Sequence, residues 1–415
     1  MSDYPKASIP TDPVMCAASF GSNRACGVPS VLDVGNVRHV TSGRIAIGLA
    51  LQQMQVGVGD EVLIPAYHSR SMVEPVIWAG AQPVFFKVHH DTSLDLDDVL
   101  AKLTSRSKTI MVPNYFGFAQ DLVGIRAFCD RHGLMMLEDC AHAFFGEHAG
   151  RPLGGFGDYA IASTMKFFPV YDGGCLVSAR NELRAIALQS AGANFEIKTA
   201  FNTLERAFAY GRMQPLERLM ALPIALKDLL WGMLKKQTQR RANGFDSDDR
   251  AGRLPDTTAL GPKASDGAFG FETAWLDKRA SLVSRLMVRH VSHERIAVKR
   301  RANYLALHEQ LHDLPGCRPL YCGLAEGTVP WLFPLLADDP ATIFPLLKNA
   351  GVPVVRFAEF LWDGVDERVC AISVDLSRQV LQLPVHQELR PAERDWMIRT
   401  VRSIFLAAAR NPGAA

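Results

Sequence analysis

The chain has 415 residues, of which 48% are hydrophobic and 21% charged, and its formal net charge is +2 at pH 7. This composition is ordinary for a globular protein and excludes a disordered chain or a disulfide scaffold. The acids balance the bases, so no basic stripe favours nucleic acid as a partner. The length predicts two domains, or one large domain with an appendage.

The eight cysteines form no C-x-x-C pair and are predicted to be reduced thiols. Residues 1–25 lack a basic segment followed by an apolar one, so no secretory signal is recognisable. No uninterrupted apolar stretch reaches the roughly 18 residues of a membrane-spanning helix. We therefore expect a cytoplasmic protein. The spacing of His142 and His148 matches no recognised zinc pattern, so no metal site is predicted.

From about residue 40, patterns typical of helices and strands alternate. Helices are predicted at 42–54, 71–80, 94–104 and 121–133, and strands at 61–67, 82–88, 108–116, 134–139, 158–165 and 173–178. This alternation predicts an α/β fold with a largely parallel sheet covered by helices on both faces. Ligands bind such sheets at the carboxyl ends of the strands, so a site is expected there.

The segment from about 195 to 260 interrupts the alternation. Residues 215–241 combine apolar residues at helical spacing with a basic cluster at Lys235, Lys236, Arg240 and Arg241. A helix on a membrane surface and a helix packed on its own or a partner subunit both fit this pattern, and we favour packing. Residues 243–267 are rich in Asp, Gly and Pro and are predicted to be a loop.

A charged helix predicted at 293–311 leads into a smaller C-terminal segment. Strands are predicted there at 331–337 and 370–376, and helices at 341–351 and 391–409. The predicted divisions are an N-terminal arm at 1–37, a large domain at 38–194, a helical insert and linker at 195–270, and a connecting helix with a small α+β domain at 271–415.

The stretch ASTMKFFPVYDGG, residues 162–174, places Lys166 in an apolar segment at the end of a predicted strand. An isolated buried ammonium is costly, so this lysine must be paired, reach water or take part in chemistry. A desolvated lysine loses its proton readily and can form a Schiff base with an aldehyde. On the lysine alone, a side chain that reaches water remains the alternative.

Two further signals lie upstream of Lys166. Asp139 ends the apolar run at 134–139, where it could hold a proton on a pyridine nitrogen, and a helix N-cap is the alternative. Ser42 and Gly43 begin a predicted helix whose N–H groups could receive a phosphate, although such a start is commonly only a cap. Together the lysine, the acid and the helix start outline a pyridoxal phosphate site.

The order SGRIAI, GVGDEVLIPAY, AGAQPVFF, EDCAHAFFG and GDYAIASTMKFFPVYDGG resembles the DegT/DnrJ/EryC1/StrS aminotransferases, a branch of the fold-type I pyridoxal phosphate enzymes. The resemblance covers residues 38 to 180, with short matches at RRANYLAL and LPVHQEL. It implies that Lys166 forms the Schiff base with the cofactor and that Asp139 pairs with the pyridinium nitrogen. It also implies that His142 lies beside the ring, for which a cap or a core position is the alternative.

The resemblance further implies that Ser42, Gly43 and Arg44 form the phosphate-binding turn, with Ser163 as a candidate phosphate-binding serine. Arg44 replaces the usual threonine, which removes a hydroxyl but adds a cation that could pair with the phosphate or point to solvent. Asp172 stands where many members carry glutamate.

The aromatic residue that stacks on the ring in this family would fall near Ser69. Stacking must therefore come from Tyr67, His68 or His142, or be absent.

The resemblance implies transfer of an amino group from an amino acid, glutamate or glutamine, to a keto group of a nucleotide-linked deoxysugar. Two alternatives stay open. One is a pyridoxal phosphate-dependent sugar dehydratase, although such relatives carry histidine in place of the lysine. The other is a non-catalytic member that binds cofactor or sugar as a regulator. The fold type generally places its active site at a dimer interface, so a homodimer is expected.

Overall fold

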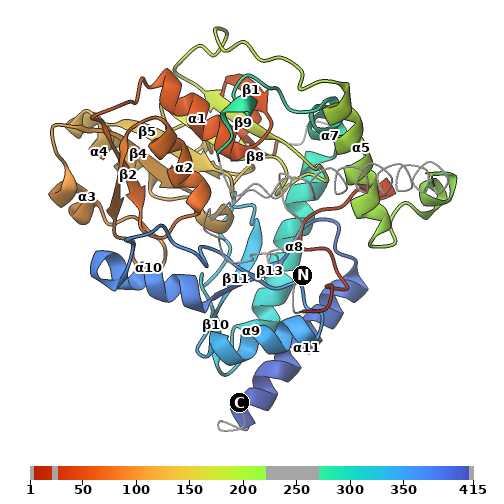
Figure 1. Cartoon of the computed structure of the whole chain (residues 1–415). Helices are drawn as coiled ribbons and strands as arrows, with labels where there is room; N and C mark the ends of the chain where they lie inside the picture. The colour runs from red at the N-terminus through yellow and green to blue at the C-terminus, as the bar shows by residue number, and fades with distance from the viewer. Residues whose placement is uncertain (1–3, 21–26, 221–270, 411–415) are drawn as a thin grey trace, which may run out of the picture.

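The computed structural model describes residues 4–20, 27–220 and 271–410, and its larger part is built on a seven-stranded sheet (Figure 1). In spatial order β1-β9-β8-β5-β4-β2-β3, its strands are β1 (Asn36–Val40), β9 (Gly174–Ser178), β8 (Tyr159–Ser163), β5 (Met135–Cys140), β4 (Ser107–Pro113), β2 (Glu61–Pro65) and β3 (Gln82–Phe86). Strands β8, β5, β4, β2 and β3 pair in parallel, whereas β9 runs antiparallel to both neighbours. The largely parallel sheet predicted from the sequence is confirmed, with one reversed strand.

Helices cover both faces of this sheet, because successive side chains of a strand point to opposite faces. In β2, Val62 and Ile64 enter one core and Leu63 enters the other. The first core contains α1 (Gly43–Gln53) and α2 (Arg70–Trp78). The second core contains α3 (Leu96–Lys102), α4 (Leu122–His132) and α7 (Leu282–His290).

The helices around the sheet begin at side chains that accept backbone N–H groups. Ser42 caps α1, Ser69 caps α2, Asp95 caps α3 and Asp121 caps α4. Helix α4 ends at Gly133, whose φ of 66° is the left-handed conformation that favours glycine. The predicted helix boundaries therefore follow from local capping chemistry.

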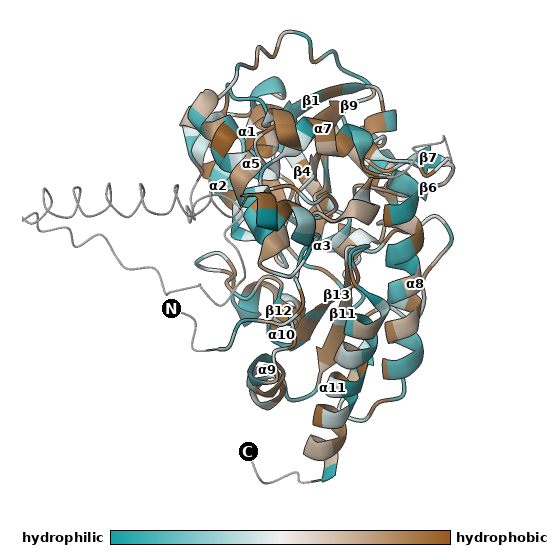
Figure 2. Ribbon diagram, turned by 90° about the vertical axis from the view of Figure 1, so that its right-hand side faces the viewer, coloured by the Kyte–Doolittle hydropathy of each residue, from teal (hydrophilic) through white to brown (hydrophobic). Residues whose placement is uncertain are grey.

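A second, antiparallel sheet of four strands lies below the first in Figure 1. In order, its strands are β10 (Cys317–Pro319), β11 (Leu332–Ala337), β13 (Val380–Pro384) and β12 (Val355–Arg356). It shares a separate core with α8 (His293–Leu311), α9 (Pro340–Asn349) and α11 (Pro391–Arg410), and Figure 2 shows the apolar strands β11 and β13 beside these helices. The boundaries of the predicted domains stay predictions.

The prediction of a strand at 370–376 is wrong, because these residues lie in helix α10 (Glu367–Gln379). Asp366 starts this helix by accepting the N–H groups of Arg368 and Val369. A short apolar run is compatible with the spacing of a strand and with that of a helix, and here the Asp366 cap favours a helix. The strand begins only afterwards, at Val380.

The predicted insert is described only in part. It contains α5 (Ala193–Phe208) and a helical segment at 214–220, so most of the amphipathic pattern at 215–241, including the basic cluster, lies outside the described residues. The remaining strands of the described chain are the short β6 (Glu147–His148) and β7 (Arg151–Pro152), and its 3-10 helices are η1 (Ala17–Ser19), η2 (Val31–Asp33), η3 (Tyr115–Gly117) and η5 (Thr273–Trp275). Within the described ranges, no helix combines the length and the apolar character needed to cross a membrane.

Candidate active site

Lys166 lies in a turn that follows β8, three residues after Ser163 ends the strand. Its ammonium nitrogen is 4.4 Å from the ring centroid of Trp331, a residue that directly precedes β11. Burial lowers the pKa of Lys166 to about 8, while the carboxylates of Asp139 and Asp12 act in the opposite direction. An appreciable fraction of this side chain is therefore a neutral amine near neutral pH.

Asp139 lies near the carboxyl end of β5, beside β8. Only 8% of its surface is exposed, and Oδ1 accepts the N–H of Ala141 at 2.8 Å. Burial raises the pKa of this carboxyl, while the Ala141 hydrogen bond and the charge of Lys166 lower it. The alternative predicted for Asp139 was a helix N-cap. Its carboxylate does accept a backbone N–H, but the residues that follow form a turn and not a helix.

His142 lies against the same tryptophan as Lys166. The ring centroids of His142 and Trp331 are 4.0 Å apart, and Nδ1 accepts the N–H of Phe116 at 3.4 Å. Burial, together with the charge of Lys166, holds the pKa of His142 well below its ordinary value, so the imidazole is neutral. The structure therefore brings Lys166, Asp139 and His142 together at the ends of β5 and β8.

The N-terminus of α1 lies beside the end of β8. Ser42 Oγ accepts the N–H of Ile45 at 3.3 Å, so this hydroxyl acts as a cap. A Cβ placed on Gly174 would lie 2.5 Å from the carbonyl carbon of Ser42, so β9 can approach this turn only through a glycine. A Cβ on Gly43 would lie 3.8 Å from Cβ of Ser163, which places the helix start beside the end of β8.

Arg44 does not simply extend into solvent. Its Nε lies 3.4 Å from Oε2 of Glu74 on α2, in an ion pair between two half-buried side chains. The guanidinium nevertheless lines the cavity that contains Lys166. The cation added at this position is therefore partly balanced by a carboxylate from the neighbouring helix.

Asp172 and the two glycines after it shape the far end of the lysine turn. Asp172 accepts the backbone N–H of Ser281 at 2.8 Å and the Ser281 hydroxyl at 2.6 Å, which fixes the start of α7. Gly173 has φ 126°, and a Cβ there would lie 2.3 Å from Oγ1 of Thr164. The sequence Asp-Gly-Gly therefore closes the turn and anchors it to α7 and α1.

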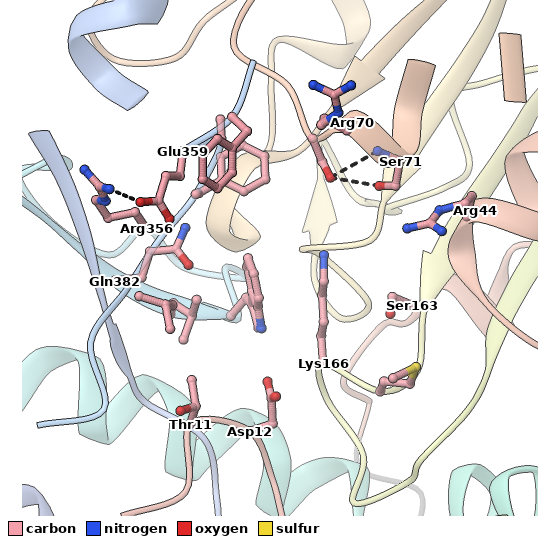
Figure 3. Close-up of a pocket in the computed structure, with 18 of the residues that line it drawn as sticks. Thr11, Asp12, Arg44, Arg70, Ser71, Ser163, Lys166, Arg356, Glu359 and Gln382 are labelled. Atoms are coloured by element: carbon pink, nitrogen blue, oxygen red, sulfur yellow. Dashed lines mark hydrogen bonds and ion pairs between the residues drawn. The ribbon is translucent and has the colours of Figure 1, made fainter. Parts of the chain in front are cut away.

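A cavity of about 340 Å³ surrounds the Lys166 side chain. Figure 3 shows Lys166 extending into it, with Arg44 and Ser163 on one side and Arg356, Glu359 and Gln382 on the other. Asp12 and Thr11 of the N-terminal arm line the cavity as well. Four of the predicted site residues lie outside its lining: Asp139, His142, Ser42 and Gly43.

Sequence reasoning missed several of these lining residues. Arg70, Trp331, Arg356, Glu359 and Gln382 come from segments that the fold alone brings to Lys166. Arg356 forms an ion pair with Glu359, and no motif marked either residue. The one available signal was the position of Arg70, directly after the Ser69 that replaces the family aromatic residue.

The three sequence candidates for ring stacking lie differently. Tyr67 is fully buried, with its ring centroid 5.2 Å from that of Phe357. His68 donates from Nδ1 to the carbonyl of Ala66 at 2.9 Å and accepts the N–H of Trp362 at Nε2, so it ties the end of β2 to the segment before α10. Tyr67 and His142 both contact the ring of Phe357, which lines the cavity, and His142 also contacts the lining ring of Trp331.

The donor set fits pyridoxal phosphate. A partly neutral amine, a buried carboxylate and the N-terminus of a helix meet at one edge of the sheet, and they match an aldehyde, a ring nitrogen and a phosphate. Gly174 allows β9 to lie directly against the Ser42–Gly43 turn, as expected for a backbone site that binds a phosphate. His142 and Trp331 add aromatic surface next to the amine.

The fold is that of pyridoxal phosphate-dependent aminotransferases. The chain superimposes with a TM-score of 0.57 on NtdA from Bacillus subtilis, solved with bound cofactor PMP, over 90% of this chain and 74% of that one at 18% identity. A family model described as the DegT/DnrJ/EryC1/StrS aminotransferase family matches residues 30–221. Over these residues, which are somewhat less than half of the chain, the chain is similar to this family, in agreement with the resemblance seen in its motifs.

The curated relatives each match about a third of the chain. A UDP-N-acetyl-3-dehydro-alpha-D-glucosamine 3-aminotransferase from Acidithiobacillus ferrooxidans is 36% identical over 149 residues, which are 34% of this chain and 40% of the relative. A pleiotropic regulatory protein from Geobacillus stearothermophilus is 34% identical over 149 residues, which are 34% of this chain and 39% of that one. The matched region thus spans about two fifths of each relative.

Proposed function

We propose that the protein is a pyridoxal phosphate-dependent aminotransferase that moves an amino group from an amino acid, glutamate or glutamine, to a keto group of a nucleotide-linked deoxysugar. The observation that carries the proposal is the buried Lys166 amine beside Asp139 at the ends of β5 and β8. The name of the Acidithiobacillus relative supports a nucleotide-linked keto sugar as the acceptor.

Pyridoxal phosphate supplies a ring that accepts the electron pair left when the α-carbon of the amino donor loses a proton. Lys166 would take that proton at Nζ and return it, since burial lowers its pKa to about 8 and a base with a pKa near neutral pH can do both. Asp139 would hold a proton on the ring nitrogen. Ser42, Ser163 and the N–H groups of α1 would bind the phosphate, and Trp331 would keep water from Nζ.

A regulator without catalytic activity is the second candidate. The observation that favours it is the name of the Geobacillus relative, a pleiotropic regulatory protein that is similar over the same share of the chain. Lys166 counts against a dehydratase, because the dehydratase relatives carry histidine there. Turnover of the bound cofactor by an amino donor separates the enzyme from the regulator.

The test is an absorbance spectrum of the full chain reconstituted with pyridoxal phosphate, before and after excess glutamate or glutamine. The proposal expects the visible band of the lysine-bound cofactor to fall and a near-ultraviolet band of the aminated cofactor to grow. Lys166→Ala should lose the linkage that borohydride makes permanent, whereas Lys299→Ala, at an exposed position of α8, should keep it. A visible band that no amino donor changes would favour the regulator.

A further inference from the structure

Arg300 is a fully buried arginine in the middle of α8. Its guanidinium carbon lies 4.4 Å from the ring centroid of Phe167, the residue after Lys166. Within the described part of the chain, its hydrogen-bond partners are all neutral: three backbone carbonyls and one amide. Burying a cation without a hydrogen-bonded carboxylate costs free energy. We therefore ask which contacts this guanidinium makes that an apolar side chain could not make.

The hydrogen bonds of Arg300 join segments that are far apart in the sequence. Nη2 donates to the carbonyl of Lys166 at 2.7 Å. Nη1 donates to the carbonyl of Trp331 at 2.9 Å and to that of Pro330 at 3.3 Å. One side chain thus holds the backbone of the lysine and the backbone of the tryptophan whose ring lies against the lysine ammonium.

Gln387 extends the same cluster. Its Oε1 accepts from Arg300 Nε at 3.0 Å, and its Nε2 donates to the carbonyl of Phe167 at 2.8 Å. The pair therefore holds two successive carbonyls of the lysine turn, those of Lys166 and Phe167. Arg300 and Gln387 are both almost completely buried, so water does not compete for these bonds.

The guanidinium is the side chain suited to this task. Its donors lie in a rigid planar fork, so a single group can reach three segments at fixed angles, which a lysine ammonium on a flexible stem cannot do. Burial lowers the pKa of Arg300 to about 9, while Asp12 and Glu388 act in the opposite direction. The four hydrogen bonds of the guanidinium offset the free-energy cost of its burial.

We propose that Arg300, with Gln387 as its partner, is a positioning residue that fixes the Lys166 turn against Trp331 and so presents Nζ to the cofactor and the substrate. This inference rests on the proposed function, in which Lys166 reacts. Without the guanidinium, nothing else among the described side chains joins the Lys166 carbonyl to that of Trp331. The turn could then move away from β11, and the ammonium would become more exposed to water.

The test compares Arg300→Lys and Gln387→Met with the control Arg301→Lys. Arg301 is the next residue of α8 and also donates to two backbone carbonyls, those of Ala325 and Thr328, but not to the lysine turn. The cofactor-free proteins react with pyridoxal phosphate across a pH series. The amine and the aldehyde condense with loss of water, borohydride reduces the new bond, and peptide mass spectrometry quantifies the product at position 166.

The unsubstituted protein should react with a midpoint near the Lys166 pKa of about 8. Asp139 and Asp12 act on the pKa of this amine, and His142 is influenced by its charge. The other charged or titratable side chains around the same cavity are Arg44, Arg70, Glu74, Tyr171, Arg206, Arg356 and Glu359. None of the variants alters any of these groups. Arg300→Lys should raise the midpoint by about one pH unit, because the ammonium becomes more exposed to water. It should also lower kcat by roughly 10- to 100-fold with KM for the amino donor changed by less than about threefold, because Nζ is misplaced.

Gln387→Met should give a smaller shift in the same direction, and Arg301→Lys should give none. If Arg300→Lys fails to fold, as judged by circular dichroism and thermal unfolding, Gln387→Met decides alone. Folded variants whose midpoint and rate equal those of the unsubstituted protein would overturn the positioning role while leaving the proposed function intact. An unsubstituted protein that forms no bond at position 166 would overturn both.

Discussion

Lys166 makes the free energy of unfolding depend on pH in the protein without cofactor. Burial lowers its pKa from the ordinary 10.5 to about 8, so between these values the unfolded chain holds a proton that the folded chain lacks. Stability therefore rises with pH in this window and is lowest below pH 8. We expect Lys166→Met to raise the free energy of unfolding by about 1–3 kcal/mol at pH 7, and the gain to shrink toward pH 10.5.

Urea denaturation of the cofactor-free proteins at pH 7 and at pH 10.5 measures this difference. Lys299→Met, at an exposed position, is the matched control and should change stability little at either pH. A Lys166→Met gain of equal size at both pH values would show that the ammonium is not desolvated in the folded chain.

At the scale of elements, the contact between α1 and β9 shapes the proposed phosphate site. A Cβ at Gly174 would lie 2.6 Å from the backbone nitrogen of Gly43 and equally close to Ser42. We expect Gly174→Ala to lower the free energy of unfolding by about 1–3 kcal/mol and to weaken pyridoxal phosphate binding, because the start of α1 must move.

Thermal unfolding and a fluorescence titration with pyridoxal phosphate measure the two effects of Gly174→Ala. Gly323→Ala is the control, since a Cβ there would meet no atom within 4 Å. Unchanged affinity in a destabilised Gly174→Ala protein would place the phosphate elsewhere.

Most elements of the large sheet could be predicted because each was marked by more than one local signal. The strand β2 is an apolar run and is buried at every position, and the helix after it begins at a capping serine. The segment at 370–376 lacked such agreement, since its apolar residues fit a strand and only the Asp366 cap indicated a helix. Hydrophobic periodicity therefore predicted the type of element correctly where the length of the segment and its capping residues agreed with it.

At the scale of the whole molecule, the candidate site was predictable only on the side that carries motifs. Lys166, Asp139 and Ser42 follow strands or begin a helix in a known topology, so their convergence could be expected. Trp331 directly precedes β11 and Gln382 lies in β13, and no local pattern indicates how the second sheet packs against the first. Their part in the site depends on tertiary contacts such as those of Arg300.

The N-terminal arm supplies the last prediction, because Asp12 acts on a lysine that is remote in sequence. Its carboxylate favours the charged form of Lys166 and forms an ion pair with Arg206 at 3.7 Å. Asp12→Asn removes this negative charge and releases a cation from its partner, so the Lys166 pKa should fall below about 8, by up to about one unit. The pH midpoint of bond formation with pyridoxal phosphate measures the shift, with Asp313→Asn, a highly exposed carboxylate, as control. A midpoint that rises in Asp12→Asn would mean that the arm acts on Lys166 by excluding water rather than through its charge.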